Sequence, residues 1–94
     1  MDISEIRKEI DKTDKSLCEL IKKRMECSAK IAQYKKVHDL PIYLPEREKE
    51  IIEKLTENES EDTQDYIKEL YMKIFEISRS YQQKIIESDN NSQG

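Results

Sequence analysis

The sequence contains very little glycine and proline and no tryptophan. Its 94 residues include one glycine and two prolines, with 40% charged and 35% hydrophobic residues. Sheet proteins need turn residues and a larger apolar share, whereas this mixture is typical of helices bathed in solvent. The length allows one domain at most. The composition therefore predicts a small all-α protein.

The sequence also lacks a long apolar run and an excess of basic residues. No apolar run approaches the roughly 18–20 residues needed to cross a membrane. The first five residues, Met1 to Glu5, lack the basic-then-apolar layout of a signal peptide. The net charge of −4 makes nucleic acid a poor partner. We expect a cytoplasmic protein that binds neither membrane nor nucleic acid.

Two cysteines are present, and their spacing excludes a disulfide within one helix. Cys18 and Cys27 are nine residues apart, which is about 13 Å along a helix. The Cα atoms of a disulfide lie within about 7 Å of each other. The sequence has no CxxC motif and no Cys–His cluster, so we expect no metal site. Cys27 falls on an apolar line and is expected in the core.

Hydrophobic residues recur every seven positions between Ile3 and Tyr34, without a proline or glycine. This repeat predicts a long helix that lies along other helices. One line of the repeat holds Ile3, Ile10, Leu17, Arg24 and Ile31, and the line three positions later holds Ile6, Thr13, Leu20, Cys27 and Tyr34. A mostly polar stripe beside these lines holds Arg7, Asp14, Ile21, Ser28 and Lys35.

The predicted first helix, from about Ser4 to Lys36, is too long for this chain to cover. At 1.5 Å per residue, it forms a rod of roughly 50 Å. A compact domain of this size has a radius of gyration of only about 12–13 Å. We therefore infer that a second copy covers the apolar lines, so that the protein is a homodimer.

The rest of the chain predicts one short helix and one long helix. The short helix runs from about Pro45 to Thr56, after a connection at residues 37–44, because proline suits a first turn. The second long helix runs from about Thr63 to Glu87. The helical domain thus covers residues 1–87, and residues 88–94 are expected to be disordered. The predicted buried face of the last helix is Ile67, Leu70, Ile74, Ile77, Tyr81 and Ile85.

Several cations fall on inward-facing positions. Arg24 lies on an apolar line, so an anion should meet it, either Asp14 or a glutamate in an internal ion pair, or a ligand. Arg7 is 17 residues away, about 25 Å along the same helix. In an antiparallel dimer, Arg7 of one copy would approach Arg24 and Lys35 of the other. The alternative for Arg7 and Lys35 is a solvated helix edge.

Polar candidates also occur on the other two helices. Arg47 lies one turn from apolar residues and so faces inward, with Glu48 beside it. Ser78 and Gln82 are spaced i, i+4 next to the apolar face. Each has a simpler interpretation, as surface charge or as a spare polar group at a helix contact. Several cations converging on one place between three helices nevertheless indicate an anionic ligand.

The order of these residues resembles the small all-helical class of chorismate mutase. The resemblance covers residues 3–86 and rests on Arg7, Asp14, Arg24, Lys35, Arg47, Glu48, Ser78 and Gln82. It implies an intertwined dimer of three-helix chains. It also implies the rearrangement of chorismate to prephenate in phenylalanine and tyrosine biosynthesis, a pericyclic isomerisation that uses neither metal nor cofactor.

The resemblance implies a role for each matching residue. Arg24, and Arg7 from the partner chain, resemble the arginines that hold the two carboxylates of the substrate. Lys35 resembles the lysine that binds a carboxylate and the ether oxygen, and Gln82 resembles the second donor to that oxygen.

The other matching residues resemble supporting groups of the site. Arg47 resembles a pocket arginine, Glu48 the carboxylate that accepts the substrate hydroxyl, and Ser78 a carboxylate contact. Some members of the family have an aspartate four residues before the glutamate, where this chain has Leu44. Glu48 is then left as the main partner of the hydroxyl.

Two other functions fit the same residues. An isochorismate pyruvate-lyase of the same fold would use the same cations on a similar dianion. A helical dimerisation module without a ligand would use them as ion-pair partners. Comparing the turnover of chorismate and isochorismate distinguishes the mutase from the lyase. A rise in melting temperature when chorismate or an anionic transition-state mimic is added distinguishes the mutase from a module without a ligand.

Because the side chain at position 82 is a neutral amide, it donates a hydrogen bond at any ordinary pH. We therefore predict no loss of activity between about pH 6 and 8 that is caused by Gln82. A Gln82→Glu variant donates only when its carboxyl is protonated, so its activity should fall as the pH rises. The measurement is initial rate against pH for both proteins. A steep fall in the wild type that is absent from Gln82→Glu would contradict the prediction.

Overall fold

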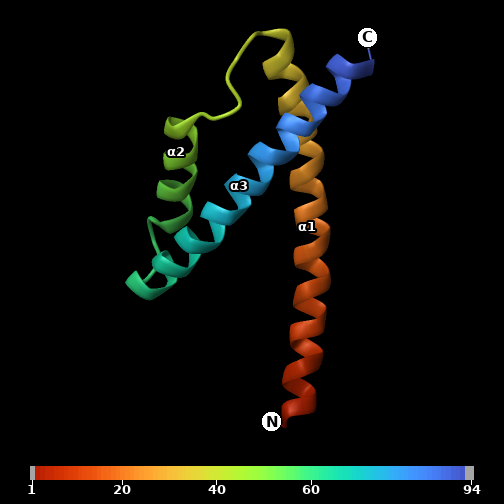
Figure 1. The fold of residues 1–94 in the computed structure, drawn as a ribbon. Coiled ribbons are helices and arrows are strands. Elements are labelled where there is room, and N and C mark those ends of the chain that lie inside the picture. Colours follow the sequence, from red (N-terminus) through yellow and green to blue (C-terminus); the bar gives the residue numbers. More distant parts are fainter. Residues whose placement is uncertain (1, 93–94) are drawn as a thin grey trace.

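The computed structural model describes residues 2–92 and contains three helices (Figure 1). They are α1 (Ile3–Val37), α2 (Pro45–Thr56) and α3 (Glu61–Ser92). No strand occurs in this part of the chain. The predicted all-α class and the long, short, long order of the helices are confirmed.

Local interactions define both ends of α1. At the start, the Asp2 carboxylate accepts a hydrogen bond of 2.9 Å from the backbone N–H of Glu5, which satisfies one free donor of the first turn. At the end, Asp39 adopts a positive φ of 54°, and the N–H of Leu40 donates to the Lys35 carbonyl over 2.8 Å. This left-handed residue turns the chain away from the helix axis.

The turn between α2 and α3 is held by one glutamine and one serine. The Gln64 side-chain amide donates to the carbonyls of Thr56 and Glu59, each over 3.0 Å. The Ser60 hydroxyl accepts from the N–H of Thr63 over 3.3 Å. These bonds satisfy the end of α2 and the start of α3, so the two helices form a hairpin.

Helix α3 is longer than the sequence indicates. It continues to Ser92, whereas the sequence predicts an end at about Glu87, and the disorder expected for residues 88–94 stays a prediction. Residues 93 and 94 lie outside the described part of the chain. No proline or glycine interrupts the sequence between Glu61 and Ser92, so no residue there forces the helix to end.

Helix α3 lies between the other two helices and packs against both (Figure 1). It crosses only the C-terminal half of α1, where Ser28, Ala32 and Lys35 are buried. The N-terminal half of α1 extends away from the other helices. The described molecule is therefore elongated, at 59 × 28 × 14 Å with a radius of gyration of 17.0 Å.

The apolar lines of α1 are not covered by this chain. Cys27 is exposed, so the prediction that it belongs to the core is wrong for the single chain. On α3, Leu70 and Ile77 of the predicted buried face are 61% and 53% exposed. The apolar residues of α1 that are exposed include Ile3, Ile6, Ile10, Leu17, Leu20, Ile31 and Tyr34. The heptad pattern marks a surface that α3 does not reach, and the dimer stays a prediction.

The described helices are too polar to cross a lipid bilayer, since none has a sufficiently long apolar stretch.

The left-handed conformation of Asp39 predicts that Asp39→Gly is more stable than Asp39→Ala by about 1 kcal/mol, because only glycine adopts positive φ without a Cβ clash. The measurement is the free energy of unfolding of both variants in urea. The exposed helical residue Lys30 provides a matched control. At this position the Lys30→Ala variant should be more stable than the Lys30→Gly variant by a similar amount, because alanine favours the helix. If alanine were more stabilising than glycine at both positions, the left-handed conformation proposed for Asp39 would be contradicted.

Candidate active site

A cavity of about 490 Å³ opens between α1, α3, the start of α2 and the connection before it. Arg7 does not line it, because Arg7 lies on the projecting half of α1. The other six residues that the sequence predicted for the site all line this cavity: Arg24, Lys35, Arg47, Glu48, Ser78 and Gln82. The fold thus brings together residues from all three helices.

Lys35 is the most deeply placed cation of the cavity, with only 6% of its surface exposed. Its ammonium donates to the Gln82 side-chain oxygen over 2.9 Å and to the Ile42 carbonyl over 2.7 Å. Burial lowers the pKa of Lys35 below its ordinary value of 10.5, and the charge of Glu48 partly opposes this change. Two of the three N–H groups are used in this way, and the third remains available to a ligand.

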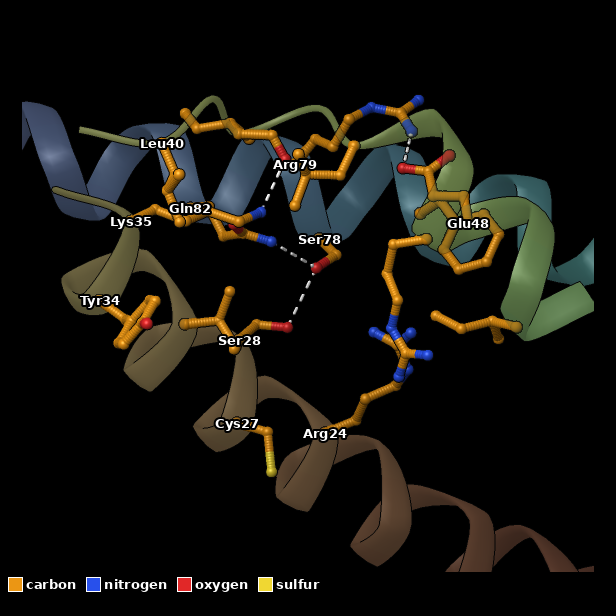
Figure 2. A pocket seen from close by; sticks show the side chains of 16 residues that line it. Arg24, Cys27, Ser28, Tyr34, Lys35, Leu40, Glu48, Ser78, Arg79 and Gln82 are labelled. Atoms are coloured by element: carbon orange, nitrogen blue, oxygen red, sulfur yellow. Dashed lines mark hydrogen bonds and ion pairs between the residues drawn. The ribbon is translucent and has the colours of Figure 1, made fainter. Parts of the chain in front are cut away.

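Gln82 is oriented by a row of hydroxyl groups (Figure 2). Its amide nitrogen donates to the Ser78 hydroxyl over 3.1 Å, and that hydroxyl lies 3.0 Å from the hydroxyl of Ser28. Because Lys35 bonds the amide oxygen, both ends of the amide are fixed. Ser28 was not among the predicted site residues, although it lies seven positions before Lys35 on the polar stripe.

Arg24 is half-buried and points from α1 toward the cavity (Figure 2). Its guanidinium carbon lies 5.8 Å from the ring centre of Tyr71 and 5.9 Å from that of Phe75. Such contacts stabilise a cation without neutralising it. Between residues 2 and 88, neither Asp14 nor another carboxylate forms an ion pair with Arg24, so the internal ion pair is not formed in this part of the chain.

Arg79 is a residue of the cavity that the sequence did not predict. Its guanidinium donates to the Glu48 carboxylate over 2.5 Å, and the two side chains are 32% and 22% exposed. The guanidinium carbon also lies 4.8 Å from the ring centre of Tyr43. The sequence could have indicated Arg79 only through its position directly after Ser78. An arginine at the polar edge of a helix is common, so this position alone does not predict a site residue.

Arg47 lies at the edge of the cavity, and its side chain is 58% exposed. It forms an ion pair of 2.8 Å with Glu50, which also pairs with Lys54 over 3.3 Å. Lys54 and then Arg47 lower the pKa of Glu50. Arg47 therefore forms a surface ion pair, which was the simpler interpretation of the sequence, and it also lines the cavity.

The cavity carries an excess of positive charge. One carboxylate, Glu48, faces four cations among the described lining residues, which are Arg24, Lys35, Arg47 and Arg79. Much of the remaining lining is apolar: Ile31, Leu40, Ile42, Leu44, Ile51 and Phe75. Within residues 2–88, no three metal-ligating side chains are grouped together. This lining suits a small organic anion with an apolar body.

The fold and the cavity define a helical protein with a cationic, partly apolar cavity between its three helices. The sequence places it more narrowly, because the chorismate mutase type II profile matches residues 6–83. The chain belongs to the chorismate mutase type II family.

Individual relatives agree with this assignment. The chain is 33% identical over 92 residues to the chorismate mutase of Methanocaldococcus jannaschii, covering 95% of this chain and 92% of that protein. It is 33% identical over 89 residues to the bifunctional chorismate mutase/prephenate dehydratase of Aquifex aeolicus, covering 89% of this chain. A T-protein of Enterobacter agglomerans is 43% identical over 47 residues.

The chain spans only about a quarter of the Aquifex protein, at 25%, and 13% of the T-protein. No solved structure gives a significant match.

The lowered pKa of Lys35 predicts a pH-dependent contribution to stability. The unfolded chain binds the Lys35 proton more tightly than the folded chain, so the free energy of unfolding should rise with pH between the folded pKa and 10.5. The measurements are the Lys35 titration by NMR and urea unfolding across that window, with Lys35→Met as the control that lacks this rise. A folded pKa at or above 10.5 would contradict the burial of this ammonium.

Proposed function

We propose that the protein is a chorismate mutase, which converts chorismate to prephenate in the synthesis of phenylalanine and tyrosine. The observation that best supports this is the buried pair of Lys35 and Gln82 at the wall of a cationic cavity. The family assignment supports it independently. The reaction breaks a C–O bond while it forms a C–C bond, and no proton is transferred.

Such a reaction depends on holding a flexible dianion in its compact reactive form. Fixing the two reacting ends of the substrate removes much of the entropic part of the barrier. Arg24 has unpaired N–H donors at the cavity and can bind a carboxylate through two parallel hydrogen bonds. The apolar lining would contact the carbon ring and exclude water.

The breaking bond leaves negative charge on the ether oxygen, and two donors can stabilise it. Lys35 has one N–H that is not used by Gln82 or Ile42. The Gln82 amide nitrogen has a second N–H beside the one that bonds Ser78. Both groups are already oriented before substrate binds, so little reorganisation is needed in the transition state.

We propose that the site is completed by a second copy of the chain. Arg7 lies on the half of α1 that the chain leaves uncovered, about 25 Å along the helix from Arg24. The exposed apolar lines of α1 support an antiparallel partner over this surface. Such a partner would bring its own Arg7 to the second carboxylate of the substrate.

We also propose a cytoplasmic location for the enzyme. Cys18 and Cys27 are both free thiols. Free thiols of this kind persist in a reducing compartment.

Removing an ether-oxygen donor or a carboxylate ligand should abolish most of the activity. We expect wild-type protein to convert chorismate, and Lys35→Ala and Arg24→Ala to lose roughly 100- to 1000-fold in kcat/KM. The measurement is the loss of chorismate absorbance, with prephenate identified as phenylpyruvate after acid treatment.

Lys73→Ala is the matched control, because Lys73 is exposed on α3 and pairs only with Glu76 among the described residues. A folded wild type that leaves chorismate unchanged would refute the proposal. Turnover of isochorismate in its place would assign the protein to the lyase reaction.

Mixing two inactive variants tests the shared site. Arg7→Ala and Lys35→Ala are each expected to be inactive, but a mixed dimer has one site with both native residues. Unfolding and refolding an equal mixture should recover about a quarter of wild-type activity, because half of the dimers are mixed and each has one intact site. No recovery from a mixture that forms dimers would show that Arg7 acts within its own chain, and an active Arg7→Ala variant would show that Arg7 is not needed.

A further inference from the structure

Glu48 is the one carboxylate among the described residues of the cavity, and it is surrounded by cations. Its position therefore depends on which cation holds it. The Arg79 guanidinium donates to its Oε2 atom, whereas Oε1 accepts no hydrogen bond from residues 2–88. One oxygen is thus fixed, and the other is available to a ligand.

Arg79 is itself held by three segments of the fold. It belongs to α3, its ion-pair partner Glu48 belongs to α2, and its guanidinium stacks near the ring of Tyr43 in the connection before α2. Figure 2 shows Arg79 and Glu48 joined on the side of the cavity away from Arg24. The pair is only partly exposed, so solvent screens it less than a surface ion pair.

We propose that Arg79 is a positioning residue that presents the free oxygen of Glu48 to the hydroxyl group of the substrate. This inference rests on the proposed function, since it concerns the same site. A carboxylate held at one oxygen loses the freedom to turn toward Lys35 or Arg47. The substrate hydroxyl then finds an acceptor already in place, which lowers the entropic cost of the hydrogen bond.

The test compares two bicyclic dicarboxylate mimics of the transition state, one with the ring hydroxyl and one without it. Binding to wild type, Arg79→Met, Glu48→Gln and the double variant is measured by calorimetry. We expect Arg79→Met to weaken the hydroxylated mimic about tenfold and to leave the other mimic unchanged within about twofold. Arg79→Lys should recover part of the loss.

The double variant separates positioning from an independent role. If Arg79 acts through Glu48, adding Arg79→Met to Glu48→Gln should cause no further loss of affinity for the hydroxylated mimic. Lys84→Met, which removes an exposed cation from the same helix, is the control for the change in net charge. Circular dichroism and melting temperature confirm that each variant is folded.

Three results would overturn the inference. The first is an Arg79→Met variant that binds both mimics as tightly as the wild type does. The second is an Arg79→Met variant that binds both mimics equally weakly and has a lower melting temperature, which indicates a structural role. Additive losses in the double variant would show that Arg79 does not act through Glu48. Chorismate turnover by the wild type is measured first. If the wild type does not convert chorismate, the proposed function is overturned together with this inference. If it does convert chorismate, any of the three results overturns this inference alone.

Discussion

The length of α1 is the constraint on which the rest of the structure depends. A helix that runs from Ile3 to Val37 extends beyond anything that α2 and α3 can cover, and its own chain buries only Ser28, Ala32 and Lys35. The remaining apolar residues face solvent in the single chain. Burial of such a surface is strongly favourable, so the helix that supplies Arg24 and Lys35 to the cavity also leaves the surface that the proposed second copy would cover.

The interior that the chain does form is small and unusually polar. Besides Ala32 and Phe75, its buried described residues are Ser28, Lys35, Thr56 and Gln82. Polar groups in a core cost free energy unless they are paired, and no buried side-chain polar atom within residues 2–88 lacks a partner. The polar groups at the crossing of α1 and α3 are thus satisfied by one another, and they place N–H donors at the wall of the cavity.

The sequence predicted the helices well because their ends depend on local chemistry. Asp2 caps α1 and Pro45 opens α2, and both effects are visible in a few neighbouring residues. Six of the seven site candidates line one cavity because inward polar positions on predicted helices, together with a family resemblance, indicate a shared location.

The errors have a different origin. A heptad pattern shows that a surface is apolar but not which chain covers it, so Cys27 was placed in a core that this chain does not form. Arg79 pairs with a glutamate 31 positions earlier in the sequence. That contact depends on how α2 and α3 lie against each other, and no local pattern records it.

The most direct test of the shared site is a crystal structure of the protein with the hydroxylated transition-state mimic. The account predicts two antiparallel copies, with one carboxylate of the mimic on Arg24, the other on Arg7 of the partner subunit, and the ether oxygen within hydrogen-bond distance of Lys35 and Gln82. A mimic bound by a single chain, or bound away from Lys35, would contradict it.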